Sequence, residues 1–401
     1  MIRGRFSVGA IMRALKPDLA RSILAVSQSR IRELADIAMA MDGVLRLYFG
    51  ESNQPTAQYI KDAAIGALKE GYTFYTENAG LPSLRAAIAR KYEEIHGVVL
   101  DPAQRIVVTA SGVQALHLSI RCVLDPGDEA IVLTPAWPNG SAIVGMCSAH
   151  AIHISHPLRG DRYEIDFDAL ESAIGNRTRL IICTSPSNPL GWVATESDQE
   201  RLLGICRREG LWLLADEVYE RLFYEGPVAP SILRKCKPGE SVIAVNSFSK
   251  SYCMTGWRLG WLVSRPDLIR KATQLNEFVV SHAPSMTQKA GEIALRDGEA
   301  ELKTMVERLK KNRDFVREAL RQMPGVTVPQ AEGAFYLFPK IEGLQDSFEF
   351  CRQLLLRKKV GLAPGVAFGE GGEGSVRICY AADRSVLEPA VERLDSFLRG
   401  T

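Results

Sequence analysis

Lys250 lies in a segment whose side chains could bind both an aldehyde and a phosphate group. The segment follows a strand-like run, Val242 to Val245, and also contains Ser247, Ser249 and Arg258. A lysine amine can form a Schiff base with a carbonyl group. Hydroxyl groups and a guanidinium can bind phosphate oxygens. Together these groups suggest an enzyme that holds pyridoxal phosphate (PLP) covalently.

A second phosphate-binding element is expected at Ser111, Gly112 and Val113. These residues follow a strand-like run and open a helical pattern. Small residues let the backbone approach a ligand closely, and a helix N-terminus offers unpaired N–H groups with a partial positive charge. Alone, such a turn is equally well explained as a helix cap. Combined with the serines and the arginine near Lys250, it predicts a phosphate site built from two strand ends.

Asp216 and Tyr219 follow another apolar run, Leu211 to Ala215. A carboxylate at the end of a buried strand is costly unless it has a partner. One interpretation of Asp216 is a helix N-cap. The other is a partner for the protonated nitrogen of a pyridine ring, which keeps the ring able to accept electrons. Tyr219 could reach the same ring, or it could belong to the core.

Asn188, Trp137 and Arg377 complete the candidate residues. Asn188 lies in the turn sequence Asn-Pro-Leu-Gly, where its amide could donate to a phenolate oxygen. Trp137 follows a further strand end and could stack on a flat ring, although such residues more often lie in cores or interfaces. Arg377 stands inside an apolar strand pattern, where it would pair with an acid or bind a substrate carboxylate.

From residue 105 onward, short β-branched runs alternate with helical patterns. The predicted strands are Arg105–Thr109, Ala130–Thr134, Ala151–Ser155, Arg179–Thr184, Leu211–Ala215, Val242–Val245 and Leu259–Ser264. The predicted helices between them include Val113–Val123, Asp198–Glu209 and Leu268–Phe278. This alternation predicts an α/β fold with a mostly parallel sheet between helices.

The C-terminal third follows a different pattern, which predicts a smaller α+β domain. A helical pattern covers Ala290–Met323, and a final helix is expected over Val386–Leu398. Between them, short strands are expected at Ala334–Phe338 and Val376–Tyr380, separated by a helix over Phe348–Lys358. The first 44 residues are too few for a core of their own, so we expect them to dock on this domain.

Composition excludes several classes of partner. The 401 residues carry 49 basic and 47 acidic side chains, a net charge of +2, which gives no reason to expect nucleic acid or anionic membrane. No apolar run approaches the ~18 residues of a membrane span. The eight cysteines form no CxxC pair, so the sequence predicts neither zinc nor disulfides and favours the cytoplasm. His150, His153 and His156 are interpreted as solvated or core residues, and no metal is expected.

The N-terminal segment Met1–Leu15 allows two interpretations. It contains Arg3, Arg5 and Arg13 and has no acidic residue before Asp18. Such a segment could be a transit peptide, or an upstream extension of a chain that starts at Met12. Both alternatives stay open.

The candidate residues, in this order and spacing, resemble the class I/II aminotransferases of PLP fold type I. The resemblance covers roughly Ile31 to Leu398. It implies a large domain, 45–289, with a mostly parallel, mixed seven-stranded sheet, and a small domain formed by 1–44 and 290–401. It also implies an enzyme that moves an amino group between an L-amino acid and a 2-oxo acid through a Lys250 Schiff base.

The resemblance implies a role for each candidate. Lys250 would be the Schiff-base lysine and proton shuttle, Asp216 the partner of the pyridine nitrogen, and Tyr219 a partner of the phenolate oxygen. Asn188 would contact both this oxygen and the substrate, whose α-carboxylate Arg377 would bind. The other implied contacts are Trp137 on the ring face, Gly50 in the loop over the substrate, and Ser111, Gly112, Val113, Ser247, Ser249 and Arg258 at the phosphate.

Two further implications concern assembly and substrate. Tyr75 resembles a tyrosine that reaches the phosphate of the neighbouring subunit, which implies a homodimer with shared active sites. Val113 occupies a position where some aspartate-using relatives carry a lysine that meets the distal carboxylate. Valine cannot make that contact, which weakens the expectation of an aspartate or glutamate donor.

Several alternatives remain. The same residues support C–S β-lyases, decarboxylases and racemases, because the outcome depends on which Cα bond stands perpendicular to the ring. A non-catalytic sensor on this fold usually carries a DNA-binding domain, and the residues before Phe49 show no basic helix-turn-helix pattern. A Rossmann dehydrogenase is disfavoured because no G-x-G-x-x-G follows the first strand. The identities of the amino donor and acceptor stay open.

Overall fold

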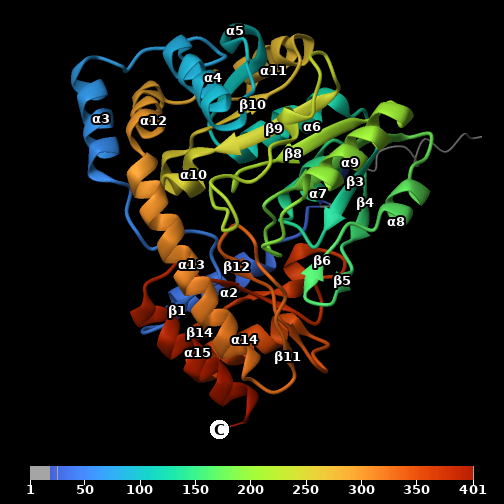
Figure 1. Cartoon of the computed structure of the whole chain (residues 1–401), viewed down its shortest axis with the longest axis vertical. Helices are drawn as coiled ribbons and strands as arrows, with labels where there is room; N and C mark the ends of the chain where they lie inside the picture. Colours follow the sequence, from blue (N-terminus) through green and yellow to red (C-terminus); the bar gives the residue numbers. More distant parts are fainter. Residues whose placement is uncertain (1–18, 25, 401) are drawn as a thin grey trace, which may run out of the picture.

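The computed structural model describes residues 19–24 and 26–400. The segment Met1–Leu15, with its two interpretations, lies outside these residues. A large sheet with its helices fills one end of the molecule, and a smaller group of helices and short strands fills the other (Figure 1). Within the described part, no helix is both long enough and apolar enough to cross a bilayer.

The large unit is built around one seven-stranded sheet with the strand order β2-β10-β9-β8-β7-β3-β4. Its strands are β2 (Ile106–Thr109), β3 (Glu129–Thr134), β4 (His150–Ser155), β7 (Thr178–Thr184), β8 (Trp212–Asp216), β9 (Val242–Ser247) and β10 (Gly260–Val263). All seven predicted strands are confirmed, with ends shifted by at most two residues. Only β10 runs antiparallel to its neighbours, β2 and β9.

Helices cover both faces of the sheet, so the strands are apolar on both sides. Alternate residues of one strand enter different cores: Leu262 packs with the core beneath α6, whereas Trp261 and Val263 pack with the opposite core. The helices of this unit are α3 (Gln58–Lys69), α4 (Pro82–His96), α5 (Pro102–Arg105), α6 (Gly112–Val123), α7 (Asn139–Met146), α8 (Phe167–Ser172), α9 (Glu196–Glu209), α10 (Phe248–Ser251) and α11 (Pro266–Val279). The predicted α/β class is therefore confirmed.

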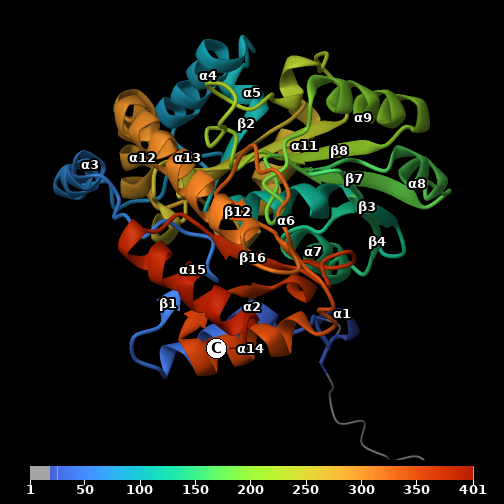
Figure 2. The ribbon, with the colours of Figure 1, turned by 60° about the horizontal axis from the view of Figure 1, so that its bottom comes forward.

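The smaller unit has its own apolar core, which joins segments from both ends of the chain. Leu34 near the N-terminus packs in the same core as Val360 and Leu387. Its helices are α2 (Arg30–Met39), α13 (Glu299–Arg321), α14 (Ser347–Lys358) and α15 (Arg384–Leu398). Its strands are β1 (Leu45–Arg46), β11 (Val326–Thr327), β12 (Tyr336–Leu337), β13 (Lys340–Ile341), β14 (Val360–Gly361), β15 (Ala363–Pro364) and β16 (Val376–Cys379). In Figure 2, α2, α14 and α15 lie together below the sheet.

The prediction of a single helix over Ala290–Met323 is wrong in one respect, because two helices meet within this range. The helix α12 (Ser285–Asp297) ends at Gly298, and α13 begins directly after it. A Cβ atom at Gly298 would lie 2.4 Å from the carbonyl oxygen of Ala294 and 2.9 Å from the Tyr252 ring. The break therefore falls where only glycine fits.

The remaining elements are short connections. They are α1 (Arg21–Leu24), β5 (Leu158–Arg159), β6 (Arg162–Tyr163), and the 3₁₀ turns η1 (Ile232–Arg234), η2 (Thr255–Trp257) and η3 (Gly365–Phe368).

Candidate active site

The carboxyl ends of the parallel strands meet at one edge of the sheet, beside a cavity of about 180 Å³ that opens to solvent. Because β10 is reversed, its amino end lies at the same edge. Open sheets bind ligands at this edge. The cavity is lined by Gly50, Gly112, Val113, Leu116, Trp137, Thr184, Asn188, Asp216, Val218, Tyr219, Ser247, Ser249, Lys250, Thr255, Arg258 and Tyr336.

Lys250 enters the cavity from α10, directly after β9. Its Nζ donates to the carbonyl oxygen of Gly50 at 2.6 Å and lies 5.8 Å from the centroid of the Tyr219 ring. Burial lowers the pKa of Lys250 to about 8, and the nearby positive charge of Arg377 acts in the same direction. A substantial fraction of this amine is therefore neutral near pH 8, and the neutral amine is the nucleophilic form.

Asp216 is the last residue of β8 and is buried. Its Oδ1 accepts a hydrogen bond from the backbone N–H of Val218 at 3.3 Å, and no other donor of the described chain reaches the carboxylate. Burial raises the pKa of Asp216 to about 6, although Lys250 opposes this shift. A buried carboxylate with so few partners suits a cationic N–H group in the cavity.

Asn188, Tyr219 and Tyr336 form a hydrogen-bonded group on one wall. The Asn188 Nδ2 donates to the Tyr219 hydroxyl at 3.4 Å, and the hydroxyls of Tyr219 and Tyr336 lie 2.8 Å apart. Burial raises the pKa of Tyr219, so its phenol keeps its proton at neutral pH. The wall therefore offers hydrogen-bond donors to an anionic oxygen.

Ser247, Ser249 and the start of α6 form a polar cup. The Ser247 hydroxyl donates to the Ser249 hydroxyl at 2.9 Å, and the first residue of α6 is Gly112. A Cβ atom on Gly260 would lie 2.5 Å from the Gly112 nitrogen, so glycine lets β10 approach the helix N-terminus. The Arg258 guanidinium lines the same cavity, and its Nη1 donates to the carbonyl of Thr255 at 2.5 Å. Hydroxyls, a helix N-terminus and a guanidinium are suited to a phosphate.

Arg377 lies in β16, behind Asn188, and is fully buried. Its Nη1 donates to the Asn188 Oδ1 at 2.9 Å, and its Nη2 donates to the carbonyl of Tyr48. Its Nε has no hydrogen-bond partner among the described residues. Among the described residues, no acidic side chain pairs with Arg377, so its guanidinium charge is not compensated by a carboxylate there.

The structure brings most of the predicted residues to the cavity. Ser111 and Arg377 lie behind the lining; Ser111 caps α6 by accepting from the Gln114 N–H at 3.1 Å. Tyr75 stands apart: it is 89% exposed and lies edge-on to the His282 ring. Sequence reasoning missed the lining residues Leu116, Thr184, Val218, Thr255 and Tyr336. Of these, Thr184 carried a signal, because it ends the strand that precedes Asn188.

The cavity fits PLP group by group. The cup and Arg258 match a phosphate, Asp216 matches a pyridinium, and Asn188 with Tyr219 matches a phenolate oxygen. Lys250 lines the same cavity, and its amine is suited to an aldehyde. Fold and cavity are those of a PLP enzyme of fold type I.

Comparison with known proteins gives the same result. The family model described as aminotransferase class I and II matches residues 44–394. The chain is 35% identical over 386 residues to an aspartate aminotransferase of Pyrococcus horikoshii, covering 95% of this chain and 97% of that protein. It is 32% identical over 378 residues to aromatic-amino-acid aminotransferase 2 of Thermococcus litoralis, covering 93% and 96%.

Solved structures are similar as well. An alanine aminotransferase from Pyrococcus furiosus superposes with a TM-score of 0.90 at 29% identity, covering 96% of this chain and all of that one. The chain belongs to the class I and II aminotransferase family. It is an enzyme that transfers amino groups between amino acids and 2-oxo acids, with PLP as its cofactor.

Proposed function

We propose that the amine of Lys250 holds the cofactor and moves the proton in this transamination. The observation that carries the proposal is the convergence of Lys250, Asp216 and Asn188 on one cavity. PLP supplies an aldehyde and a ring that accepts an electron pair. The amine of Lys250 is well suited to a proton-transfer role, because its pKa of about 8 lies close to neutral pH. Nζ would accept the proton from Cα of the substrate.

The other candidates would hold the cofactor. Asp216 would pair with the ring nitrogen, Asn188 and Tyr219 would donate to the phenolate oxygen, and Trp137 would cover the ring face. The phosphate would be held by Ser111, Gly112, Val113, Ser247, Ser249 and Arg258. Support comes from the burial of Asp216 beside a cavity in which the described chain gives it a single donor.

Arg377 would bind the α-carboxylate of the amino acid, with the Asn188 amide and the loop at Gly50 beside it. The burial of Arg377 without a carboxylate partner among the described residues supports this role, since a substrate carboxylate would supply the missing negative charge. A Cβ at Gly50 would lie 2.2 Å from the Tyr336 hydroxyl, so a larger residue here would displace the Tyr336 ring. The loop backbone can therefore lie close to the substrate.

The side chain of the substrate is proposed to be uncharged. Val113 lines the cavity with 43% of its surface exposed and cannot pair with a distal carboxylate. The named relatives act on aspartate and on aromatic amino acids. Val113 favours uncharged donors, such as the aromatic amino acids, over aspartate.

Assembly as a homodimer with shared active sites is proposed from the exposed apolar surface. Phe74, Tyr75 and Phe278 are each at least 80% exposed. Large exposed aromatic side chains are typical of protein interfaces. Tyr75 would reach the phosphate of the partner subunit's site. Static light scattering tests this assembly, and a monomer at micromolar concentration would contradict it.

We also propose a large domain of residues 45–289 and a small domain of 1–44 and 290–401. The separate apolar core that joins Leu34 to Leu387 supports this division.

A cytoplasmic location is proposed because all eight cysteines, which lie in the described part, are free thiols. Fractionation of the source cells would test the location.

The deciding experiment is a half-reaction screen. The PLP-loaded enzyme is mixed with each of a panel of amino acids, without an acceptor, and the loss of the cofactor's visible absorption is followed. We expect the fastest loss with an uncharged donor and the release of one 2-oxo acid per active site. Continuous production of pyruvate and ammonia from cysteine conjugates would instead identify a C–S β-lyase. Fastest conversion with aspartate would refute the role given to Val113.

A further inference from the structure

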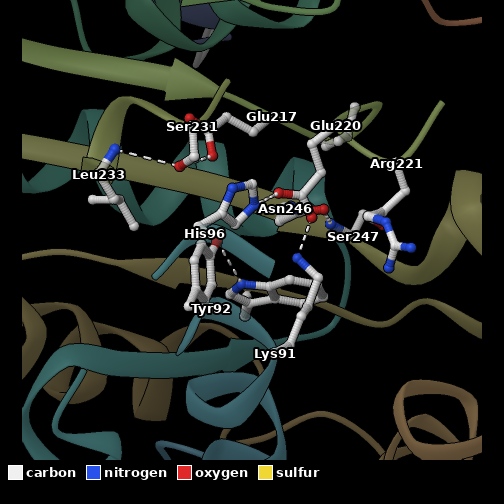
Figure 3. Close-up of polar contacts among 12 residues, drawn as sticks. Lys91, Tyr92, His96, Glu217, Glu220, Arg221, Ser231, Leu233, Asn246 and Ser247 are labelled. Carbon is white, nitrogen blue, oxygen red and sulfur yellow. Dashed lines mark hydrogen bonds and ion pairs between the residues drawn. The ribbon is translucent and has the colours of Figure 1, made fainter. Parts of the chain in front are cut away.

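A buried polar network holds Glu217 and Glu220 of the turn Asp216–Arg221 (Figure 3). Asp216 and Tyr219 of this turn line the cavity, whereas Glu217 and Glu220 do not. Both glutamates are only 2% exposed. The turn thus combines residues that line the cavity, Val218 among them, with two glutamates that are anchored in the protein.

Glu220 is anchored by the helix α4. The Lys91 ammonium forms an ion pair with its Oε1, and the His96 Nε2 lies 2.8 Å from its Oε2. Burial alone would raise the pKa of Glu220, but Lys91 and His96 together hold it well below its usual range. Lys91 also lies over the rings of Tyr92 and Trp261, at 4.7 and 5.3 Å from their centroids. The Lys91 ammonium is therefore held between a carboxylate and two aromatic rings.

Glu217 anchors the other end of the turn. Its Oε2 accepts from the Ser231 hydroxyl at 2.8 Å, and its Oε1 accepts from the Ile232 N–H at 2.7 Å. Its own N–H donates to the carbonyl of Val245 in β9 at 2.8 Å. The turn is thus held from η1, from β9 and from α4.

Stability alone does not account for the ion pair at Glu220. A buried ion pair is seldom more stabilising than apolar side chains of similar volume, because both charges lose their hydration. What the pair adds is a defined geometry, since Lys91 and His96 each contact a different carboxylate oxygen of Glu220. Because Glu220 follows Tyr219 directly, this arrangement also constrains the backbone that carries the Tyr219 ring.

We propose that Lys91, His96 and Glu220 are positioning residues, which hold the turn so that Asp216 and Tyr219 face the cofactor. The inference deepens the proposed function and rests on the roles given there to Asp216 and Tyr219. Neither Lys91 nor Glu220 lines the cavity, so neither would touch the cofactor. Their effect would pass through the backbone of the turn.

The test uses the double variant Lys91→Met/Glu220→Leu, which removes both charges and fills the space with apolar atoms. The single variant Glu220→Gln keeps the shape and loses the charge. The control is Asp297→Asn, which breaks an ion pair with Arg296 between two exposed side chains outside the turn. Three quantities are measured: the melting temperature of the apoenzyme, the Kd of the apoenzyme for PLP, and kcat with KM of the loaded enzyme.

We expect the double variant to melt near the wild-type temperature but to bind PLP at least tenfold more weakly. Its kcat should fall about tenfold or more with KM little changed, because a misplacement of 1 Å can cost about 100-fold in rate. The pH at which the bound cofactor's visible absorption changes should also shift. Glu220→Gln should show the same changes to a smaller extent, and the control should show none.

A double variant with wild-type Kd, kcat and absorption would overturn the inference. If the double variant fails to fold, Glu220→Gln decides: wild-type values of its Kd, kcat and absorption would overturn the inference equally. Failure of the proposed function would appear in the wild-type protein instead, as a lack of PLP binding or of transamination in the same assays. The two failures can therefore be told apart.

Discussion

The lowered pKa of Lys250 makes a measurable prediction about the protein without its cofactor. The amine has a pKa of about 8 in the folded chain, against 10.5 for an unperturbed lysine. The unfolded chain therefore holds this proton up to a higher pH than the folded chain does. The contribution of Lys250 to the free energy of unfolding is lowest below pH 8 and rises as the pH passes from about 8 to 10.5. Replacement of Lys250 by methionine should remove this dependence.

The size of the effect follows from the two pKa values. Each pKa unit corresponds to about 1.4 kcal/mol, so the protonated amine costs at most about 3 kcal/mol below pH 8. The side chain is half-buried and faces the open cavity, so solvent screening reduces this figure to about 1–3 kcal/mol. The apoprotein with Lys250→Met should therefore be more stable than the wild type by this amount at pH 7. The gap should shrink by pH 9.5.

Urea unfolding of the two apoproteins at pH 7 and pH 9.5 measures the gap. Lys303→Met is the control, because Lys303 is an exposed residue of α13, and its stability difference should stay constant between the two pH values. A gap for Lys250→Met that is the same at both pH values would refute the reasoning about burial. Normal transamination by this variant would refute the catalytic role of Lys250.

Further predictions concern three other site residues, Asp216, Arg377 and Tyr75. Asp216→Ala should lower kcat far more than it weakens PLP binding, and unchanged turnover would contradict the pairing with the ring nitrogen. Because the pKa of Asp216 is about 6, PLP affinity of the wild-type apoenzyme should fall as the pH drops below 6, and Asp216→Asn should lack this fall in a fluorescence titration. Arg377→Lys should raise KM about tenfold or more for both the amino acid and the 2-oxo acid, because a single amine replaces the planar guanidinium. Steady-state kinetics measure this change, and KM values equal to those of the wild type would count against the carboxylate role. Tyr75→Phe should speed the loss of PLP on dilution through a desalting column, whereas an unchanged rate would argue against a shared phosphate site.

The sequence was most informative about the sheet. The buried strands are apolar on both faces and end in polar residues, so both their number and their ends could be predicted. The break at Gly298 could not, because a glycine inside a helical pattern is often tolerated. Its exclusion of larger residues depends on Tyr252, which is distant in the sequence.

The site also contains residues that the sequence could place and residues that only tertiary packing places. Lys250, Arg258 and Asp216 could be placed because each adjoins a predicted strand end. Tyr336 could not, because its hydroxyl reaches Tyr219 only through the packing of the small unit against the large one. The burial of Arg377 behind Asn188 depends on the same packing, and no spacing in the sequence encodes it.

The reversed direction of β10 has a consequence for folding. Because β9 and β10 are antiparallel, Ser247 pairs with Gly260 across a loop of about a dozen residues, and this loop carries Lys250 and Arg258. The parallel pairs of the sheet need much longer crossovers, and short loops close at a smaller entropic cost. We therefore expect the hairpin that bears the lysine to form early and to guide the neighbouring strands into register. The segment that defines the chemistry would then also help to initiate the fold.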